Sequence, residues 1–391
     1  MNKHHLKFFL VVILFTVCQN ILAQNSDNIK VGAEQPELYL SKLKSKRIAL
    51  IVNPSSMVGQ THLVDYLLSK KINIKRIFAP EHGFRGNVNR GESFASDTDK
   101  VTRLPIVALY GKNVRPTKEQ LQDIDIVIYD LQDVGVRFFT YISTMGEVMN
   151  ACASNQKKLI ILDRPNPNSD YIDGPVLQPA FKSFVGKYPI PVVYGLTAGE
   201  LAKMINGEKW LDNGLLCDLE IIAVKNYTHK TFYTLPVKPS PNLPNDLSIR
   251  LYPSLCFFEA TKISVGRGTT FPFQVIGYPD KSFGTFEFTP QSIPSMEKKP
   301  LHENKICYGI DLRNAKTIPS FTLKYIIDFY KMWTDKNAFV SDIKWFNLLA
   351  GNDNLLKQIR DNKTETEIKA SWKKELDDYK LMRKKYLIYK D

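Results

Sequence analysis

The sequence contains little cysteine and histidine. It has five cysteines and six histidines among 391 residues, and no two cysteines form a CxxC pair. This spacing excludes a zinc ribbon and a dithiol redox motif. The histidines are scattered and none lies close to His82 in the chain, so we predict no metal site. We expect four cysteines to be buried small hydrophobic residues, with one or two disulfides left open as the alternative: Cys152, Cys217, Cys256 and Cys307.

Several functional motifs are absent as well. No GxGxxG turn follows a predicted strand, which argues against NAD or FAD, and we predict no cofactor. No GxSxG elbow supports a serine nucleophile. No basic stripe with interleaved aromatic residues indicates nucleic-acid binding. Lys and Arg exceed Asp and Glu by 53 to 40, a formal charge of +13, which fits anionic surroundings or anionic substrates.

Long hydrophobic runs are also missing, apart from a short one near the start. Residues 8–17 are apolar, with Lys3 and Lys7 before them and Ala23 after them. This run is too short for a permanent membrane span and is typical of a secretory signal peptide, here residues 1–23. Cys18 follows the bulky Val17, which argues against a lipoprotein. We therefore expect an exported protein, periplasmic or secreted, without a stable membrane span.

The middle of the chain alternates short apolar runs with helical patterns. Runs at 46–53, 72–79, 104–110, 124–131 and 158–163 read as buried strands, and 62–71 and 140–155 read as helices. Such alternation predicts a mostly parallel sheet covered by helices on both faces. We therefore predict an α/β fold, with a Rossmann-like domain over residues 40–210.

The character of the sequence changes in the second half. Residues 219–224 form one more strand candidate, 281–305 are polar and predict loops or edge strands, and helical patterns occupy 321–333, 340–349 and 367–389. In the last segment apolar residues recur every three to four positions, as in a single amphipathic helix packed on a core. We predict a smaller α+β domain over residues 211–391 that closes a cleft.

Polar clusters follow three of the predicted strands. Their sequences are PEHGFRG at 80–86 with GE at 91–92, DLQDVGVR at 130–137, and DRPNP at 163–167. Ligands of open α/β sheets bind beyond the carboxyl ends of the strands. Three strand ends would therefore deliver carboxylates and guanidiniums to one rim, and this convergence is the main functional signal from the residues themselves.

The same segments carry a family resemblance. FAPEHGFRG (78–86), YDLQDVGVRFFTYISTM (129–145), LDRPNPNSDYIDGP (162–175), PSPNLP (239–244) and ISVGRGTTFPF (263–273) resemble the NamZ-type exo-β-N-acetylmuramidases. The chain departs from that pattern at 258–262, FEATK, where the family more usually has Glu-Gly-Thr-Asn. The resemblance implies a two-domain glycoside hydrolase of peptidoglycan turnover and cell wall recycling. Its activity would be release of N-acetylmuramic acid from the non-reducing end of peptidoglycan saccharides or muropeptides.

Glycoside hydrolysis needs a proton donor and a second group that stabilises the oxocarbenium-like centre. Glu81 is the first candidate for the acid, since partial desolvation beside an aromatic residue would favour its protonated form. Glu92 can face the same cleft. Asp130 and Asp133 could position water or substrate. Nucleophilic participation of the substrate's own acetamido group remains open.

Substrate recognition has its own requirement. Muramic acid differs from glucosamine by a lactyl carboxylate, which suits a two-pronged guanidinium contact. The candidates for substrate binding are His82, Arg85, Arg137, Asp163, Arg164, Asn166, Asn242 and Arg267.

Two other functions remain as alternatives. A non-catalytic muropeptide- or sugar-binding protein would use the arginines without the acid. A metal-dependent phosphoesterase would use Asp130, Asp133 and Asp163, and would lose its activity with a chelator.

Overall fold

A seven-stranded sheet forms the core of the N-terminal half. The computed structural model describes residues 29–81, 83–85, 97–294, 296–314 and 319–391. The strand order is β5-β6-β4-β1-β7-β8-β9, and all neighbours are parallel except β5 and β6. The strands are β1 (Arg47–Val52), β4 (Asn73–Ala79), β5 (Asp97–Thr98), β6 (Pro105–Ala108), β7 (Ile126–Asp130), β8 (Lys158–Leu162) and β9 (Leu219–Ile222). The predicted mostly parallel sheet is confirmed.

The central strands are buried because helices cover both faces of the sheet. Ile51 of β1 belongs to one hydrophobic cluster with α5 (Tyr141–Ser154) and α6 (Ala198–Gly207). Its neighbour Leu50 belongs to a second cluster with α3 (Leu63–Ser69) and residues of α2 (Leu40–Leu43). Successive side chains of a strand point to opposite faces, so a continuous apolar run fits this two-sided burial.

The C-terminal half contains a smaller antiparallel sheet and several helices. The sheet has the order β10-β12-β11. Its strands are β10 (Val275–Tyr278), β11 (Phe286–Phe288) and β12 (Cys307–Asp311). The helices are α7 (Asp246–Leu255), α8 (Lys324–Met332), α9 (Ile343–Ala350), α10 (Asn354–Arg360), α11 (Glu365–Ser371) and α12 (Lys373–Arg383). Strand β9 belongs to the larger sheet although it follows residue 210, where the sequence analysis ended that domain.

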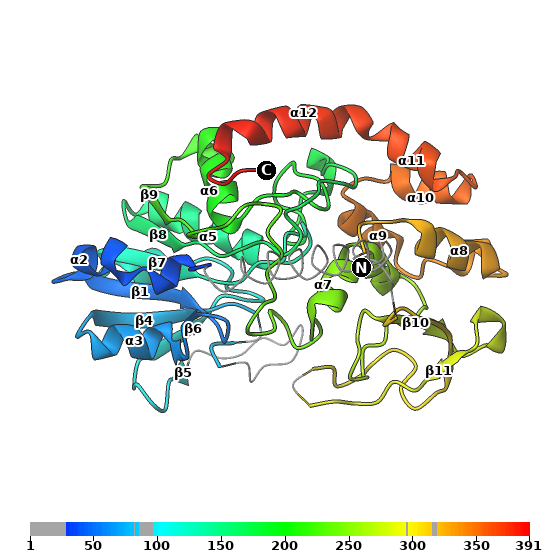
Figure 1. Ribbon diagram of the computed structural model, residues 1–391, viewed down its shortest axis with the longest axis horizontal. Helices are drawn as coiled ribbons and strands as arrows, with labels where there is room; N and C mark the ends of the chain where they lie inside the picture. The colour runs from blue at the N-terminus through cyan, green and yellow to red at the C-terminus, as the bar shows by residue number, and fades with distance from the viewer. Residues whose placement is uncertain (1–28, 82, 86–96, 295, 315–318) are drawn as a thin grey trace, which may run out of the picture.

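The last helical segment differs from the prediction. Residues 367–389 were expected to form one helix, but α11 ends at Ser371 and α12 begins at Lys373, because Trp372 has φ −106° and ψ 6°. α12 then runs back over the N-terminal half (Figure 1). There the Tyr379 hydroxyl donates to the backbone oxygen of Tyr194 at 2.6 Å. The end of the chain therefore ties the two halves together.

The remaining expectations concern cysteines and membrane spans. All four described cysteines are buried and free, which confirms their prediction as small hydrophobic residues. None of the helices in the described part of the chain is both long and apolar enough to cross a bilayer. The proposed signal peptide lies outside the described residues.

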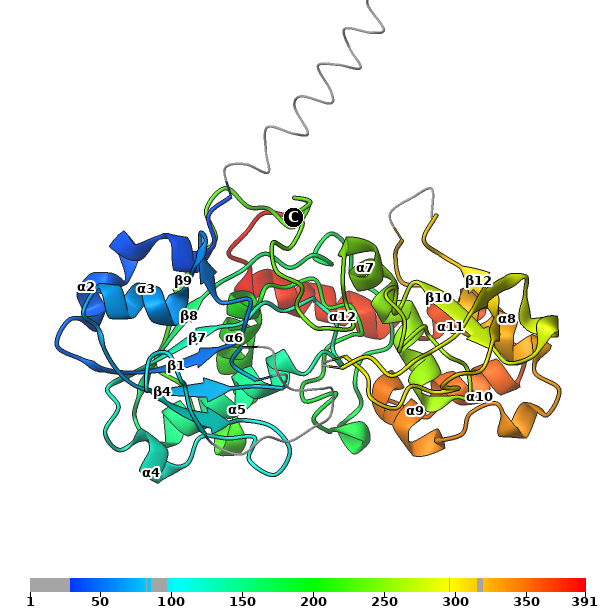
Figure 2. The ribbon, with the colours of Figure 1, turned by 90° about the horizontal axis from the view of Figure 1, so that it is seen from below.

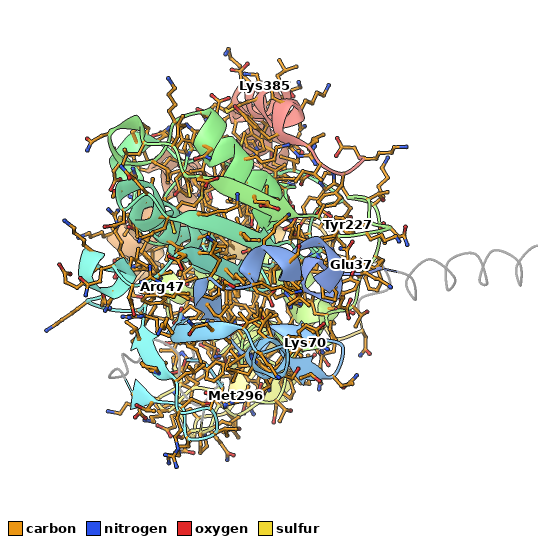
Figure 3. All side chains as sticks on the ribbon, turned by 90° about the vertical axis from the view of Figure 1, so that its left-hand side faces the viewer. Glu37, Arg47, Lys70, Tyr227, Met296 and Lys385 are labelled. Atoms are coloured by element: carbon orange, nitrogen blue, oxygen red, sulfur yellow. The ribbon has the colours of Figure 1, made fainter. Side chains whose placement is uncertain are left out.

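The orientation of the large sheet determines where a site can form. The strand arrows point toward the C-terminal half in two perpendicular views (Figures 1 and 2). The opposite end of the sheet carries charged surface side chains such as Arg47 and Lys70 (Figure 3). Arg47 pairs there with Asp125 at 2.7 Å. The carboxyl ends of the strands, by contrast, face the C-terminal elements.

Candidate active site

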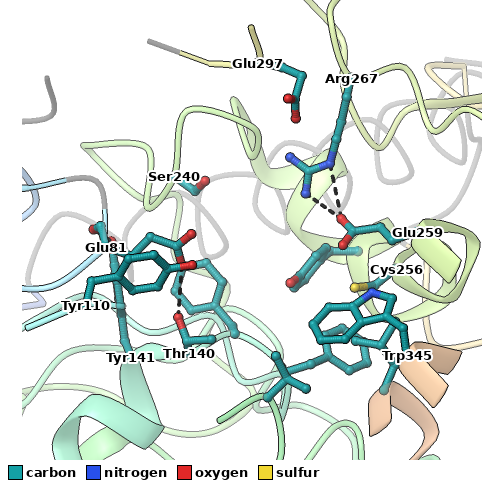
Figure 4. Close-up of a pocket in the computed structure, with 15 residues that line it drawn as sticks. Glu81, Tyr110, Thr140, Tyr141, Ser240, Cys256, Glu259, Arg267, Glu297 and Trp345 are labelled. Carbon is teal, nitrogen blue, oxygen red and sulfur yellow. Dashed lines mark hydrogen bonds and ion pairs between the residues drawn. The ribbon is translucent and has the colours of Figure 1, made fainter. Parts of the chain in front are cut away.

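A cavity of about 230 Å³ lies where the strand ends meet the C-terminal half (Figure 4). Loops after β4, β6 and β7 supply one part of its lining, and α7, α9 and the loops around the small sheet supply the other. The lining residues are Glu81, Tyr110, Phe138, Phe139, Thr140, Tyr141, Val185, Ser240, Tyr252, Cys256, Glu259, Arg267, Glu297, Trp345 and Leu349.

Glu81 enters the cavity directly after strand β4. Pro80 follows the last residue of the strand and has no N–H to continue a ladder. The half-buried Glu81 side chain accepts a hydrogen bond at Oε2 from the hydroxyl of Thr140 at 3.2 Å. Thr140 occupies the N-cap position of α5, but its side chain makes no cap hydrogen bond. Its hydroxyl is therefore directed to the carboxylate, beside the helix N-terminus that stabilises negative charge.

Tyr141 lies next to Glu81 and also lines the cavity. Its hydroxyl accepts from the side-chain amide of Asn53 at 3.0 Å and donates to the backbone oxygen of Glu81 at 3.3 Å. Burial raises the pKa of Tyr141 well above its usual value, and the nearby Glu81 charge adds to the effect. The phenol therefore stays protonated and holds the Glu81 backbone as a hydrogen-bond donor.

Arg267 and Glu259 occupy the other side of the cavity (Figure 4). Arg267 donates to Oε1 of Glu259 from Nε at 3.2 Å and from Nη2 at 2.5 Å. Its guanidinium also lies over the ring of Phe273, 4.9 Å from the ring centre. The third nitrogen, Nη1, is buried and has no hydrogen-bond partner in the described structure. It lies on the side of the guanidinium away from Glu259 (Figure 4).

Two glycines allow Arg267 to take this position. Gly266 and Gly268 have φ values of 77° and 81°, in the left-handed region that favours glycine. A Cβ on Gly268 would lie 2.6 Å from the backbone oxygen of Gln291. The Gly-Arg-Gly sequence therefore forms a tight turn that presents one cationic side chain.

Aromatic side chains and further polar groups complete the lining. Trp345 projects from α9, and Phe138 packs edge-on against Tyr252 with ring centres 5.3 Å apart. Ser240 and Glu297 lie along another edge of the cavity (Figure 4). Aromatic side chains together with convergent polar groups are usual in the lining of a small-ligand site. The described lining residues include three carboxylates and a single guanidinium.

The sequence-predicted site residues divide into separate groups. Glu81 and Arg267 line the cavity. Glu92 and His82 lie outside the described residues. Arg85 does not line the cavity. Its guanidinium donates to Asp99 through two 3.0 Å hydrogen bonds and holds the pKa of that carboxyl well below its usual range.

Asp130 and Arg164 were predicted for catalysis and for substrate binding, and the structure places both elsewhere. They form a buried pair in which Arg164 donates from Nε at 2.5 Å and from Nη2 at 2.9 Å. The side chains are 0% and 4% exposed, respectively. Since each satisfies the other in the interior, neither side chain reaches the cavity.

Asp133 and Asp163 are also buried away from the cavity. Asp133 accepts from the hydroxyl of Tyr194 and from the N–H of Gly135. Asp163 accepts from Thr197 and Tyr389, each at 2.7 Å. Burial raises the pKa of both carboxyls to about 6, against the lowering effect of these hydrogen bonds. These carboxyls support loops and the C-terminal segment, not a ligand.

Arg137 was predicted to contact the substrate, but the structure places it in the interior, where it binds backbone oxygens. It is fully buried, and burial lowers its pKa to about 9. It donates to four backbone oxygens, those of Pro175, Ile190, Leu349 and Ala350, over 2.7–2.9 Å. Arg137 therefore anchors the end of α9, whose Trp345 and Leu349 line the cavity.

The two predicted asparagines are buried as well, each only 2–3% exposed. Asn166 donates to the backbone oxygen of Leu196 at 2.8 Å. Asn242 donates to that of Met296 at 3.2 Å, and its own side-chain oxygen has no partner in the described structure. Neither asparagine belongs to the cavity lining.

Sequence reasoning did not assign a role to Glu259, Glu297 or Trp345. Glu259 lies in a motif where the chain departs from the resembled family, eight positions before Arg267. That motif was the available signal for it. In the described part of the chain, no group of three His, Cys, Asp or Glu side chains is arranged to hold a metal ion.

Comparisons with known proteins cover nearly the whole chain. Residues 48–247 match the family model described as "Exo-beta-N-acetylmuramidase NamZ, N-terminal", and residues 250–389 match the corresponding C-terminal model. The chain is 37% identical over 375 residues to the peptidoglycan beta-N-acetylmuramidase NamZ of Bacillus subtilis (strain 168), covering 90% of this chain and 89% of that protein.

Two crystal structures of DUF1343 family proteins from Bacteroides fragilis NCTC 9343 share the fold. One, at 1.30 Å resolution, is 46% identical with a TM-score of 0.85, and the other, at 1.65 Å, is 30% identical with a TM-score of 0.81. Each comparison covers 93% of this chain and 99% of the solved chain.

Proposed function

Because the chain belongs to the NamZ family of exo-β-N-acetylmuramidases, we propose that it releases N-acetylmuramic acid from the non-reducing end of peptidoglycan fragments, with Glu81 as the proton donor. The chain is a glycoside hydrolase by its relationship to the Bacillus subtilis enzyme. The single observation that supports the choice of Glu81 is its place in the cavity, half-buried and hydrogen-bonded to Thr140 at 3.2 Å.

The proposed first step is protonation of the glycosidic oxygen. Glu81 in its acid form gives its proton to the leaving sugar while the C–O bond breaks, and positive charge develops at the anomeric carbon. The carboxylate that remains is stabilised by the Thr140 hydroxyl and by the adjacent N-terminus of α5.

The site of action follows from the same proposal. We propose that the protein is exported and acts in the periplasm or outside the cell, since residues 1–23 have the sequence pattern of a secretory signal peptide. Fractionation of cells that express the full-length gene, followed by N-terminal sequencing of the recovered protein, tests this. An uncleaved protein found only in the cytoplasm would contradict it.

The role of Glu81 can be tested with two leaving groups. We expect Glu81→Gln to lower kcat by about 10²–10⁴-fold on a disaccharide with N-acetylglucosamine as leaving group, because that sugar needs a proton to depart. A 2,4-dinitrophenyl glycoside of N-acetylmuramic acid departs without a proton, so there we expect the loss to stay below about ten-fold.

A matched control uses an exposed glutamate of the small sheet. Glu287 lies on β11 and is exposed, and Glu287→Gln should retain the wild-type rate on both substrates. An equal loss on both substrates in the Glu81 variant would remove Glu81 from the role of acid. Binding of the disaccharide by the wild-type protein without any cleavage would favour a sugar-binding protein in place of an enzyme.

A further inference from the structure

Arg267 differs from the other three arginines that the sequence suggested as carboxylate contacts. Arg137 and Arg164 are buried with partners of their own, and Arg85 pairs with Asp99. Arg267 is the one cationic side chain among the described residues that line the cavity. The structure therefore reduces the four candidates to one.

The hydrogen bonds of Arg267 are incomplete. A single carboxylate oxygen of Glu259 accepts from both Nε and Nη2. The side chain of Arg267 is only 14% exposed and that of Glu259 only 9%. Nη1 is buried without a partner in the described structure and lies on the side of the guanidinium away from Glu259 (Figure 4). A buried guanidinium donor without an acceptor destabilises a protein. A ligand oxygen at this place would remove that penalty.

We propose that Arg267 binds the lactyl carboxylate of N-acetylmuramic acid through Nη1, and that Glu259 positions the guanidinium for this contact. The inference rests on the proposed function, from which the substrate class is taken. A charge-assisted guanidinium–carboxylate contact is strong and directional. The lactyl ether therefore lies on the Arg267 side of the cavity and the scissile bond on the Glu81 side (Figure 4).

The other charges of the cavity make this contact selective. Besides Glu81, which acts in its acid form, Glu259 and Glu297 are the described acidic groups of the lining, so an anionic sugar is repelled unless it meets Arg267. N-acetylglucosamine has no carboxylate and would leave Nη1 unsatisfied. Sites built to hydrogen-bond a substrate group reject analogues that lack the group far more strongly than apolar pockets reject a missing methylene.

The main test measures selectivity. We expect wild-type protein to hydrolyse the para-nitrophenyl glycoside of N-acetylmuramic acid at least about 10²-fold more efficiently, in kcat/KM, than that of N-acetylglucosamine. Arg267→Ala should lower the first value by about 10²-fold and change the second by less than about three-fold. Arg267→Lys keeps the positive charge but loses the two-pronged guanidinium. Its kcat/KM on the N-acetylmuramic acid glycoside should therefore lie between the values of the wild type and Arg267→Ala.

Glu259 is tested as a positioning residue. Glu259→Gln keeps an acceptor for Arg267 but removes the charge that orients the guanidinium, and we expect the selectivity ratio to fall by about ten-fold, mainly through KM. The matched control is Arg313→Ala. Arg313 also pairs with a carboxylate, that of Asp311 at 2.8 Å, and lies over an aromatic ring, that of Phe271, but it does not line the cavity. Its loss should leave the selectivity unchanged.

A binding experiment separates this inference from the proposed function. By calorimetry, wild-type protein should bind free N-acetylmuramic acid at least about ten-fold more tightly than N-acetylglucosamine, and Arg267→Ala should bind both equally. Absence of hydrolysis with this binding pattern intact would overturn the enzymatic proposal alone. Equal losses on both glycosides in the folded Arg267→Ala protein, or wild-type selectivity in that variant, would overturn the inference.

Discussion

Two carboxylate–guanidinium pairs in this molecule have the same chemistry and different surroundings. Asp130 and Arg164 meet through two parallel hydrogen bonds at the end of β7, with side chains 0% and 4% exposed. Glu259 and Arg267 meet through one shared oxygen beside the cavity, and one buried guanidinium nitrogen has no partner in the described structure. Residue type alone therefore does not distinguish a structural pair from a pair that binds a ligand. The pair that we propose for recognition differs in having an unpartnered guanidinium nitrogen on a side chain that lines a cavity.

The largest effect should come from breaking the structural pair. Asp130→Ala leaves Arg164 as an unpaired buried charge, which we expect to lower the free energy of unfolding by about 3–5 kcal/mol. Urea denaturation followed by circular dichroism measures this change. The kcat/KM per folded molecule should stay within about three-fold of wild type, since Asp130 does not line the cavity. If Asp130→Ala were as stable as the wild type but inactive, the Asp130–Arg164 pair would have a functional role in place of a structural one.

The buried carboxyls near the strand ends should also influence stability through pH. Burial raises the pKa of Asp133 to about 6, above the ordinary value, so the folded state keeps a proton between about pH 4 and pH 6 that the unfolded state has lost. This stabilisation is complete below about pH 4 and is lost as the pH rises through 6. At about 1.4 kcal/mol per pKa unit the contribution is about 2–3 kcal/mol.

Asp163 contributes in the same direction, because burial raises its pKa to about 6 as well. Asp133→Asn removes one of the two titrations, so the decline in the free energy of unfolding between pH 4 and 7 should become shallower by about 2–3 kcal/mol. Urea midpoints at half-unit pH steps measure this slope. Identical slopes for variant and wild type would mean that Asp133 ionises normally in the folded protein.

A smaller effect is expected from the aromatic wall of the cavity. Trp345→Ala removes an aromatic surface on which a sugar can pack, and we expect KM to rise about two- to ten-fold, equivalent to about 0.5–1.5 kcal/mol. Trp210 is the matched control, because it is also half-buried but stacks on Tyr188 outside the cavity lining. Trp210→Ala should leave KM unchanged, and an equal rise in both variants would argue against a specific contact.

The smallest effect concerns a pair that lies entirely at the surface. Lys374 and Asp378 form an i,i+4 ion pair on α12 with side chains 88% and 62% exposed. Water and salt screen such a pair, so Lys374→Ala should leave both the urea midpoint and kcat/KM unchanged. A measurable loss of activity would assign α12 a role in contact with the anionic polymer.

Much of the fold could be predicted from local sequence. Continuous β-branched runs such as 46–53 and 158–163 became β1 and β8 within a residue or two, because strands covered on both faces need apolar side chains at every position. The predicted helix over 367–389 is two helices, since Trp372 leaves the helical conformation. Hydrophobic spacing of 3–4 residues continues across that break and does not reveal it.

The candidate site was predicted only in part. Glu81 could be found because a strand followed by proline ends at the sheet edge where ligands bind. Asp163 satisfied the same rule, but its carboxylate is engaged by Tyr389, far along the chain. Arg137 likewise donates to the backbone oxygens of Leu349 and Ala350. Partners so distant in sequence have no local signature.

The sequence by itself determined the succession of the parallel strands, the prolines that follow several of them, and the family to which the chain belongs. These depend on the chemistry of residues close together in the chain. Only the tertiary structure decided which charged side chains remain available to a ligand. That property depends on whether another part of the chain supplies the acceptor or donor that each buried polar group requires.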